Sequence, residues 1–169
     1  MNLIIKSLIA LALPLSIPFQ AMARVDAGTQ SLIQTVNANG VRVVVNNDRC
    51  SQENILGSYR SRGLQRQMVL CPGKTVDAID HATVRHETWH AVQHCINAAR
   101  GTDRNTPVQM DINVLAADVN KSVPANEVTF IKNSYSEDMW LVEMEATLVE
   151  HIFTAEEVQQ IFLKVCTAE

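Results

Sequence analysis

The sequence predicts one α+β domain, in which a small antiparallel sheet precedes a long helix and a group of C-terminal helices. Three observations lead to this fold class. Short strand-like runs occur at residues 41–45, 55–59 and 67–70, a stretch without Gly or Pro covers 76–99, and helical patterns fill the chain after residue 124. The 169 residues are 47% hydrophobic and 19% charged, a composition that supports a single packed core.

The N-terminal residues 1–23 have the three-part pattern of a signal peptide: a short segment with Lys6, an apolar run at 8–19, and Ala21-Met22-Ala23. Two prolines interrupt the apolar run, which is also shorter than the ~20 apolar residues that a membrane-spanning helix needs. We therefore expect cleavage after Ala23 and export of a single domain, residues 24–169, to the periplasm or the cell exterior, without a membrane anchor.

The sheet is expected in the first half of this domain. A polar lead-in precedes the β-branched run at 41–45, and turn residues at 46–48 follow it. The two further strand candidates come at 55–59 and 67–70. We expect these runs to form the antiparallel sheet, which Pro72-Gly73 closes.

The longest expected helix covers 76–99 and ends at Gly101. With about 100° between successive residues, one face carries an apolar stripe that borders the core. The stripe consists of Ala82, Trp89, Val92 and Ile96. Along the edge of the stripe lie Ile79, His86, His90 and Gln93.

After this helix, the polar segment 101–122 is interpreted as a long loop with a short turn at 114–119. Helices are expected at 124–132 and 136–152. Thr154 begins a last helix through a capping box that Glu157 completes.

Four cysteines, in a chain expected to be exported, predict two disulfides with three possible connectivities. We favour Cys50–Cys71, which ties neighbouring strands, and Cys95–Cys166, which ties the last helix to the central one. A zinc site made by the cysteines is disfavoured, because no two of them lie two to four residues apart. The net charge of −4 and the scattered basic residues predict no surface for nucleic acid.

Residues 86–90 read H-E-T-W-H and match H-E-x-x-H in the middle of the long helix. His86 and His90 project from one helix face about 5–6 Å apart, so both imidazoles can reach one metal ion. Glu87 points about 100° away and can reach a water molecule beside the ion, as a general base must. His94 lies about 12 Å along the helix axis from His86, too far for the same ion.

Residues 85–95 resemble the active-site helix of the zincin metallopeptidases, in which a zinc ion usually has three protein ligands and one water. The metzincin pattern is excluded, because Val92 and Ile96 stand where its Gly and third His belong. Gln93 extends the motif to H-E-x-x-H-x-x-Q, a form similar to that of small exported zincins.

The third ligand is expected downstream. Residues 143–147 are similar to the E-x-x-A-D or E-x-x-A-N helix of gluzincins. The resemblance implies that Glu143 binds the metal. Thr147 stands where gluzincins have an acidic or amide residue that orients a ligating histidine. Thr147 and Gln93 would therefore lie next to the metal ligands and hydrogen-bond to them. Helical periodicity instead favours Glu145, which lies on the apolar face of this helix, where an unpaired carboxylate is costly. Glu145 therefore stays open as an alternative ligand.

The expected function is that of a zinc-dependent endopeptidase that holds one zinc ion, with Glu87 as the base, and acts on peptides or proteins. By analogy with larger zincins, an edge strand at 55–59 or 68–70 would pair with the substrate. Two alternatives are a zincin-like module that binds peptide or protein without turnover, and a disulfide-stabilised interaction domain in which the motif is accidental. Candidates for stabilising the transition state are Tyr59, Tyr135, His151 and Arg85.

Overall fold

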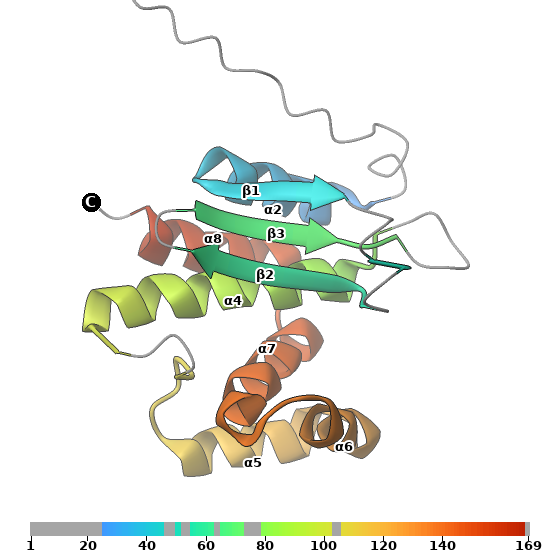
Figure 1. The fold of residues 1–169 in the computed structure, drawn as a ribbon, viewed down its shortest axis with the longest axis vertical. Coiled ribbons are helices and arrows are strands. Elements are labelled where there is room, and N and C mark those ends of the chain that lie inside the picture. Colours follow the sequence, from blue (N-terminus) through green and yellow to red (C-terminus); the bar gives the residue numbers. More distant parts are fainter. Residues whose placement is uncertain are drawn as a thin grey trace, which may run out of the picture.

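The computed structural model describes residues 25–45, 50–51, 55–62, 65–72, 79–102 and 106–167. A three-stranded sheet lies against helices α2 and α4, helix α8 packs against these two helices, and a second helical group of α5, α6 and α7 lies on the far side of α4 (Figure 1). The α+β class is confirmed. The elements are α2 (Ala27–Ala38), β1 (Val41–Val45), β2 (Gly57–Arg62), β3 (Gln65–Leu70), α4 (His81–Arg100), α5 (Ile112–Ser122), α6 (Ala125–Ser134), η1 (Glu137–Met139), α7 (Trp140–Ile152) and α8 (Ala155–Cys166).

The sheet is mixed, so the expectation of a purely antiparallel sheet is wrong. Its strand order is β1-β3-β2, with β1 parallel to β3 and β2 antiparallel to β3. The reason is that β3 inserts between β1 and β2, which run in opposite directions, so β3 can be antiparallel only to β2 and is parallel to β1. Burial explains the order: Met68, Val69 and Leu70 of β3 are buried, whereas the polar β2 suits an edge.

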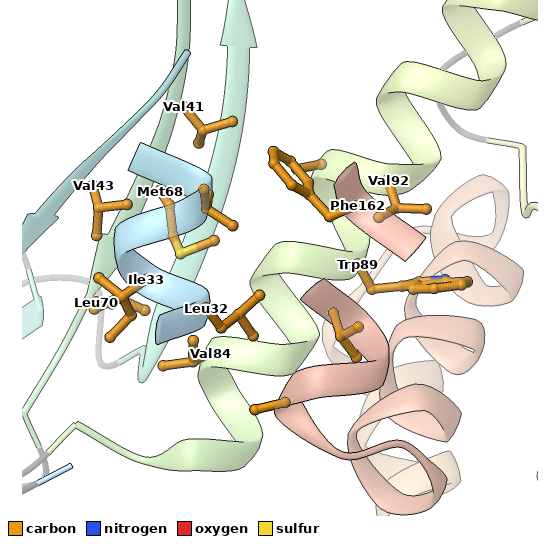
Figure 2. Packing of buried hydrophobic residues seen from close by; sticks show 14 of the residues in the cluster. Leu32, Ile33, Val41, Val43, Met68, Leu70, Val84, Trp89, Val92 and Phe162 are labelled. Carbon is orange, nitrogen blue, oxygen red and sulfur yellow. The ribbon is translucent and has the colours of Figure 1, made fainter. Parts of the chain in front are cut away.

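Helix α2 replaces the expected polar lead-in. Asp26 caps it by accepting a hydrogen bond from the backbone N–H of Thr29 at 2.9 Å. Leu32 and Ile33 (Figure 2), together with Val36, are buried in the core between the sheet and α8. Three apolar side chains are too few to give this segment a recognisable helical periodicity in the sequence. Its helical conformation is instead stabilised by packing against the rest of the fold.

Helix α4 begins at His81 rather than at residue 76, because Asp80 caps it and Ile79 pairs with Pro72 in an isolated β-bridge. It ends as expected at Gly101, whose φ of 66° favours glycine. The face toward the core carries Val84, Trp89 and Val92 (Figure 2), while the expected stripe residues Ala82 and Ile96 are only half-buried.

The C-terminal half is more helical than expected. Residues 112–122 form α5, capped by the Asp111 side chain, where a loop with a short turn was expected. The expected helix at 136–152 divides into η1 and α7, and the capping box of Thr154 and Glu157 is confirmed. A second apolar cluster that includes Leu115 and Leu148 holds α5 and α6 against α7.

Both expected disulfides are confirmed. Cys50 pairs with Cys71, which follows β3, and Cys95 of α4 pairs with Cys166 at the end of α8. By loop entropy they stabilise the fold by about 3 and about 4.5 kcal/mol. Two disulfides indicate an oxidising, exported compartment. None of the helices in the described ranges is long and apolar enough to cross a bilayer, and the expected signal peptide, residues 1–23, lies outside those ranges.

Candidate metal centre

Three side chains from two crossing helices converge on one point beneath the edge strand. His86 and His90 lie one turn apart on α4, and their Nε2 atoms are 3.1 Å from each other. Glu143 of α7 reaches both histidines, with Oε2 at 3.4 Å from Nε2 of His86 and Oε1 at 3.6 Å from Nε2 of His90. These three residues could hold a metal ion.

The spacing of these atoms suits a small tetrahedral cation. Ligand atoms about 2.0–2.1 Å from a tetrahedral zinc ion lie about 3.3 Å from one another. The three separations in the site, 3.1, 3.4 and 3.6 Å, lie close to that value. The donor set of two imidazoles and one carboxylate is also one that zinc uses in catalytic sites.

The outer nitrogens of both rings are held by acceptors. Nδ1 of His86 lies 3.0 Å from Oε2 of Glu150, and Nδ1 of His90 lies 2.8 Å from Oε1 of Gln93. Because a carboxylate and an amide oxygen only accept hydrogen bonds, both Nδ1 atoms carry protons. In their neutral forms the two rings therefore direct Nε2 lone pairs toward Glu143, which is the arrangement that a cation requires.

Glu150, rather than Thr147, orients His86. Glu150 lies two turns after Glu143 on the same face of α7, and the side chain of Arg85 donates hydrogen bonds of 2.7 and 3.3 Å to its backbone carbonyl. Thr147 is buried in α7, but the contact that the sequence assigned to it belongs to Glu150. The contact of Glu150 with His86 could have been predicted from its spacing. Glu150 lies seven residues after Glu143, and residues seven apart share a helix face.

Glu145, the alternative ligand, lies outside the three-residue group. Its carboxylate accepts hydrogen bonds from the Trp89 indole, the Gln93 amide and the backbone N–H groups of Val108 and Gln109, at 2.7–3.1 Å. Gln93 also contacts His90, whose Nδ1 lies 2.8 Å from its Oε1. The partner that a buried Glu145 requires is thus a set of N–H donors rather than a metal.

Glu87 lies beside the centre with an uncommitted oxygen. It is 6% exposed, and Oε2 has no hydrogen-bond partner in the described parts of the chain. Burial raises the pKa of Glu87, partly opposed by His86, His90 and a hydrogen bond from the Tyr59 backbone. Gly57 of β2 passes directly over this side chain: a Cβ on Gly57 would lie 2.9 Å from Cγ of Glu87. The strand can therefore cover the site only with glycine at this position.

A cleft of about 720 Å³ opens over these residues. Strand β2, helix α4 and residues of the segment 135–143 line it. Tyr59 and Tyr135 face this cleft, as does His94, whose Nδ1 lies 3.3 Å from Oγ of Ser61. Burial and the nearby Glu143 carboxylate raise the pKa of Tyr135. Two other residues were candidates for stabilising the transition state. Arg85 donates a hydrogen bond to the Glu150 backbone carbonyl. His151 lies 2.8 Å from Glu127 and belongs to a separate group of Glu127, Glu150 and His151.

The charges of the centre are set by these contacts. Burial alone would lower the pKa of His86, yet hydrogen bonds with Glu143 and Glu150 raise it to about 10. Burial alone would raise the pKa of Glu143, but its interactions with the neighbouring imidazoles of His86 and His90 lower it to about 2. At neutral pH the metal-free centre thus holds a proton on His86 at the position where a cation would bind.

Comparison with protein-family models, curated proteins and solved structures gives no match. The resemblance to zincins therefore stays a prediction.

Proposed function

We propose that this chain is a zinc-dependent endopeptidase that acts outside the cytoplasm. The observation that carries the proposal is the convergence of His86, His90 and Glu143 at zinc-like spacing, with Glu87 beside them in an open cleft. A bound zinc ion would supply the acidity that water needs to attack a peptide carbonyl near neutral pH. His86, His90 and Glu143 would hold that ion.

Glu87 would move the protons. Its unpartnered Oε2 faces no competing donor among the described residues, and its pKa is raised by burial. A carboxylate whose pKa lies closer to neutrality both accepts a proton from the attacking water and returns it to the leaving amine more readily than an ordinary glutamate. Tyr135, which also lines the cleft, would donate a hydrogen bond to the carbonyl oxygen.

Strand β2 would bind the substrate backbone. The hydrogen bond from Cys71 N–H to the Leu56 carbonyl directs alternate residues of β2 toward β3 and places the backbone groups of Gly57, Tyr59 and Ser61 on the other edge, where the Tyr59 N–H already donates to Glu87. Because β3 is central, β2 rather than residues 68–70 is the available edge. An extended peptide that pairs with this edge would lie across the cleft, above the metal ligands.

The alternative of a non-catalytic peptide-binding module rests on Thr147. The Glu150 carboxylate on His86 supplies the orientation that Thr147 cannot, and this supports hydrolysis rather than binding alone.

We also propose that the signal segment 1–23 is removed after Ala23 and that the mature domain is periplasmic or secreted, consistent with the two disulfides.

The direct test is a metal analysis combined with a cleavage assay on an unfolded protein substrate. We expect about one zinc ion per chain after zinc loading, loss of cleavage on chelation, and recovery on addition of zinc. A fully folded protein that takes up no zinc, or cleavage that survives complete metal removal, would exclude the proposal. Zinc binding without cleavage of any substrate would favour the non-catalytic module.

Zinc affinity should rise with pH. The ligand His86 must lose its proton before it binds the metal, and in the metal-free protein its pKa is about 10. Glu143, with a pKa of about 2, is already ionised and adds no slope in this range. From His86 alone we expect affinity to increase by about 100-fold between pH 6 and pH 8. Competition with a chelator of known pH dependence measures this, and a flat profile would show that His86 is not protonated in the metal-free site.

A further inference from the structure

Glu145 is a buried carboxylate with four N–H donors, placed between a loop and the metal-binding helix. Two of the donors are the backbone N–H groups of Val108 and Gln109, at 2.8 and 2.7 Å. The other two are the Trp89 indole at 3.1 Å and the Gln93 amide at 2.9 Å, both on α4. The carboxylate is therefore held from two sides and has little freedom to rotate.

This fixed carboxylate determines how the amide of Gln93 lies. The Gln93 Nε2 atom donates to Oε2 of Glu145 and, at 3.0 Å, to the backbone carbonyl of Val142. Turning the amide by 180° would place its oxygen against two acceptors, so only one orientation satisfies the buried groups. In that orientation Oε1 of Gln93 faces Nδ1 of His90 at 2.8 Å.

We infer that Glu145 is a positioning residue that acts through Gln93: it fixes the His90 ring with its proton on Nδ1 and its Nε2 lone pair toward the metal centre. The inference rests on the metal-binding part of the proposed function and extends it to a residue that touches neither metal nor substrate. A ring held in one tautomer pays no free energy to rearrange when a metal binds.

The first readout is the position of the His90 proton in the metal-free protein. Long-range ¹H–¹⁵N correlation spectra, recorded at mildly alkaline pH, distinguish a proton on Nδ1 from one on Nε2. We expect the Nδ1–H form in the full chain and a shift toward Nε2–H in Gln93→Leu. A proton on Nε2 in the unmodified protein would overturn the inference.

The second readout is metal affinity, followed by titration with cobalt(II), whose absorption reports the coordinated ion. Gln93→Leu and Glu145→Gln should each weaken binding by about 10- to 100-fold. If Glu145 acts through Gln93, the double variant should lose no more than Gln93→Leu alone. Losses that add would show that Glu145 merely stabilises the surrounding fold and would refute the assigned role.

Two further variants separate positioning from general support. Arg100 donates a 3.1 Å hydrogen bond to the Val108 carbonyl, so Arg100→Ala loosens the same segment without touching Gln93. It should leave cobalt affinity within about twofold. Glu137→Ala changes an exposed residue of η1 outside this set of hydrogen bonds, and it should leave both the His90 tautomer and the cobalt affinity unchanged. Losses in these two controls as large as that of Glu145→Gln would contradict the inference. None of these measurements requires peptide cleavage, so they remain decisive even if the chain proves not to be a peptidase.

Discussion

Glu87→Gln should abolish peptide cleavage and leave zinc in place. Glutamine has the size of glutamate but cannot accept a proton from water at neutral pH, so we expect the turnover number to fall by about 10²- to 10⁴-fold. His86, His90 and Glu143 are unchanged in this variant, and zinc content should stay near one ion per chain. Parallel measurement of cleavage and metal content by elemental analysis checks both statements.

The stability of this variant provides an internal control. Burial raises the pKa of Glu87, which means that the folded protein disfavours its charged form. A neutral amide at this position should therefore fold at least as stably, as urea unfolding would report. Glu156→Gln, an exposed glutamate on α8, serves as the matched control and should retain full activity. Cleavage that persists in Glu87→Gln would reject Glu87 as the base, whatever the metal content.

The parts of the site that the sequence predicts are those carried by single helices. The pair His86 and His90 follows from one turn of α4, and the capping box of Thr154 and Glu157 from one turn of α8, because both depend on local geometry alone. Gln93 beside His90 is of the same kind, since residues three apart meet on a helix.

Contacts between distant segments escape such reasoning. Glu150 lies 64 residues along the chain from His86. The backbone N–H of Gln109, which donates to Glu145, lies 36 residues along the chain from Glu145. Which carboxylate meets which partner depends on the angle at which α7 crosses α4, and no local pattern encodes that angle. Likewise, α2 and the insertion of β3 between the other strands depend on burial of Leu32, Ile33 and Met68 in the assembled core.

The choice between Glu143 and Glu145 gives the sharpest test of the metal centre. Three protein ligands would share a zinc-binding free energy of about 10–16 kcal/mol, so removal of one by Glu143→Ala should weaken binding by about 300- to 10⁴-fold. Glu145→Gln leaves all three ligands present and should cost only about 10- to 100-fold. Zinc competition titrations on both variants, with exposed Glu137→Ala as the unaffected control, measure the order of the effects.

The physical reason for this order lies in what each carboxylate faces. Glu143 faces the Nε2 atoms of two imidazoles, and with both rings neutral these three groups are all acceptors, an arrangement that is stable only around a cation or a proton. Glu145 faces four N–H donors, which already neutralise it without a metal. A larger loss of zinc in Glu145→Gln than in Glu143→Ala would mean that α7 presents its other carboxylate to the ion, and the centre described around His86 and His90 would then have the wrong third ligand.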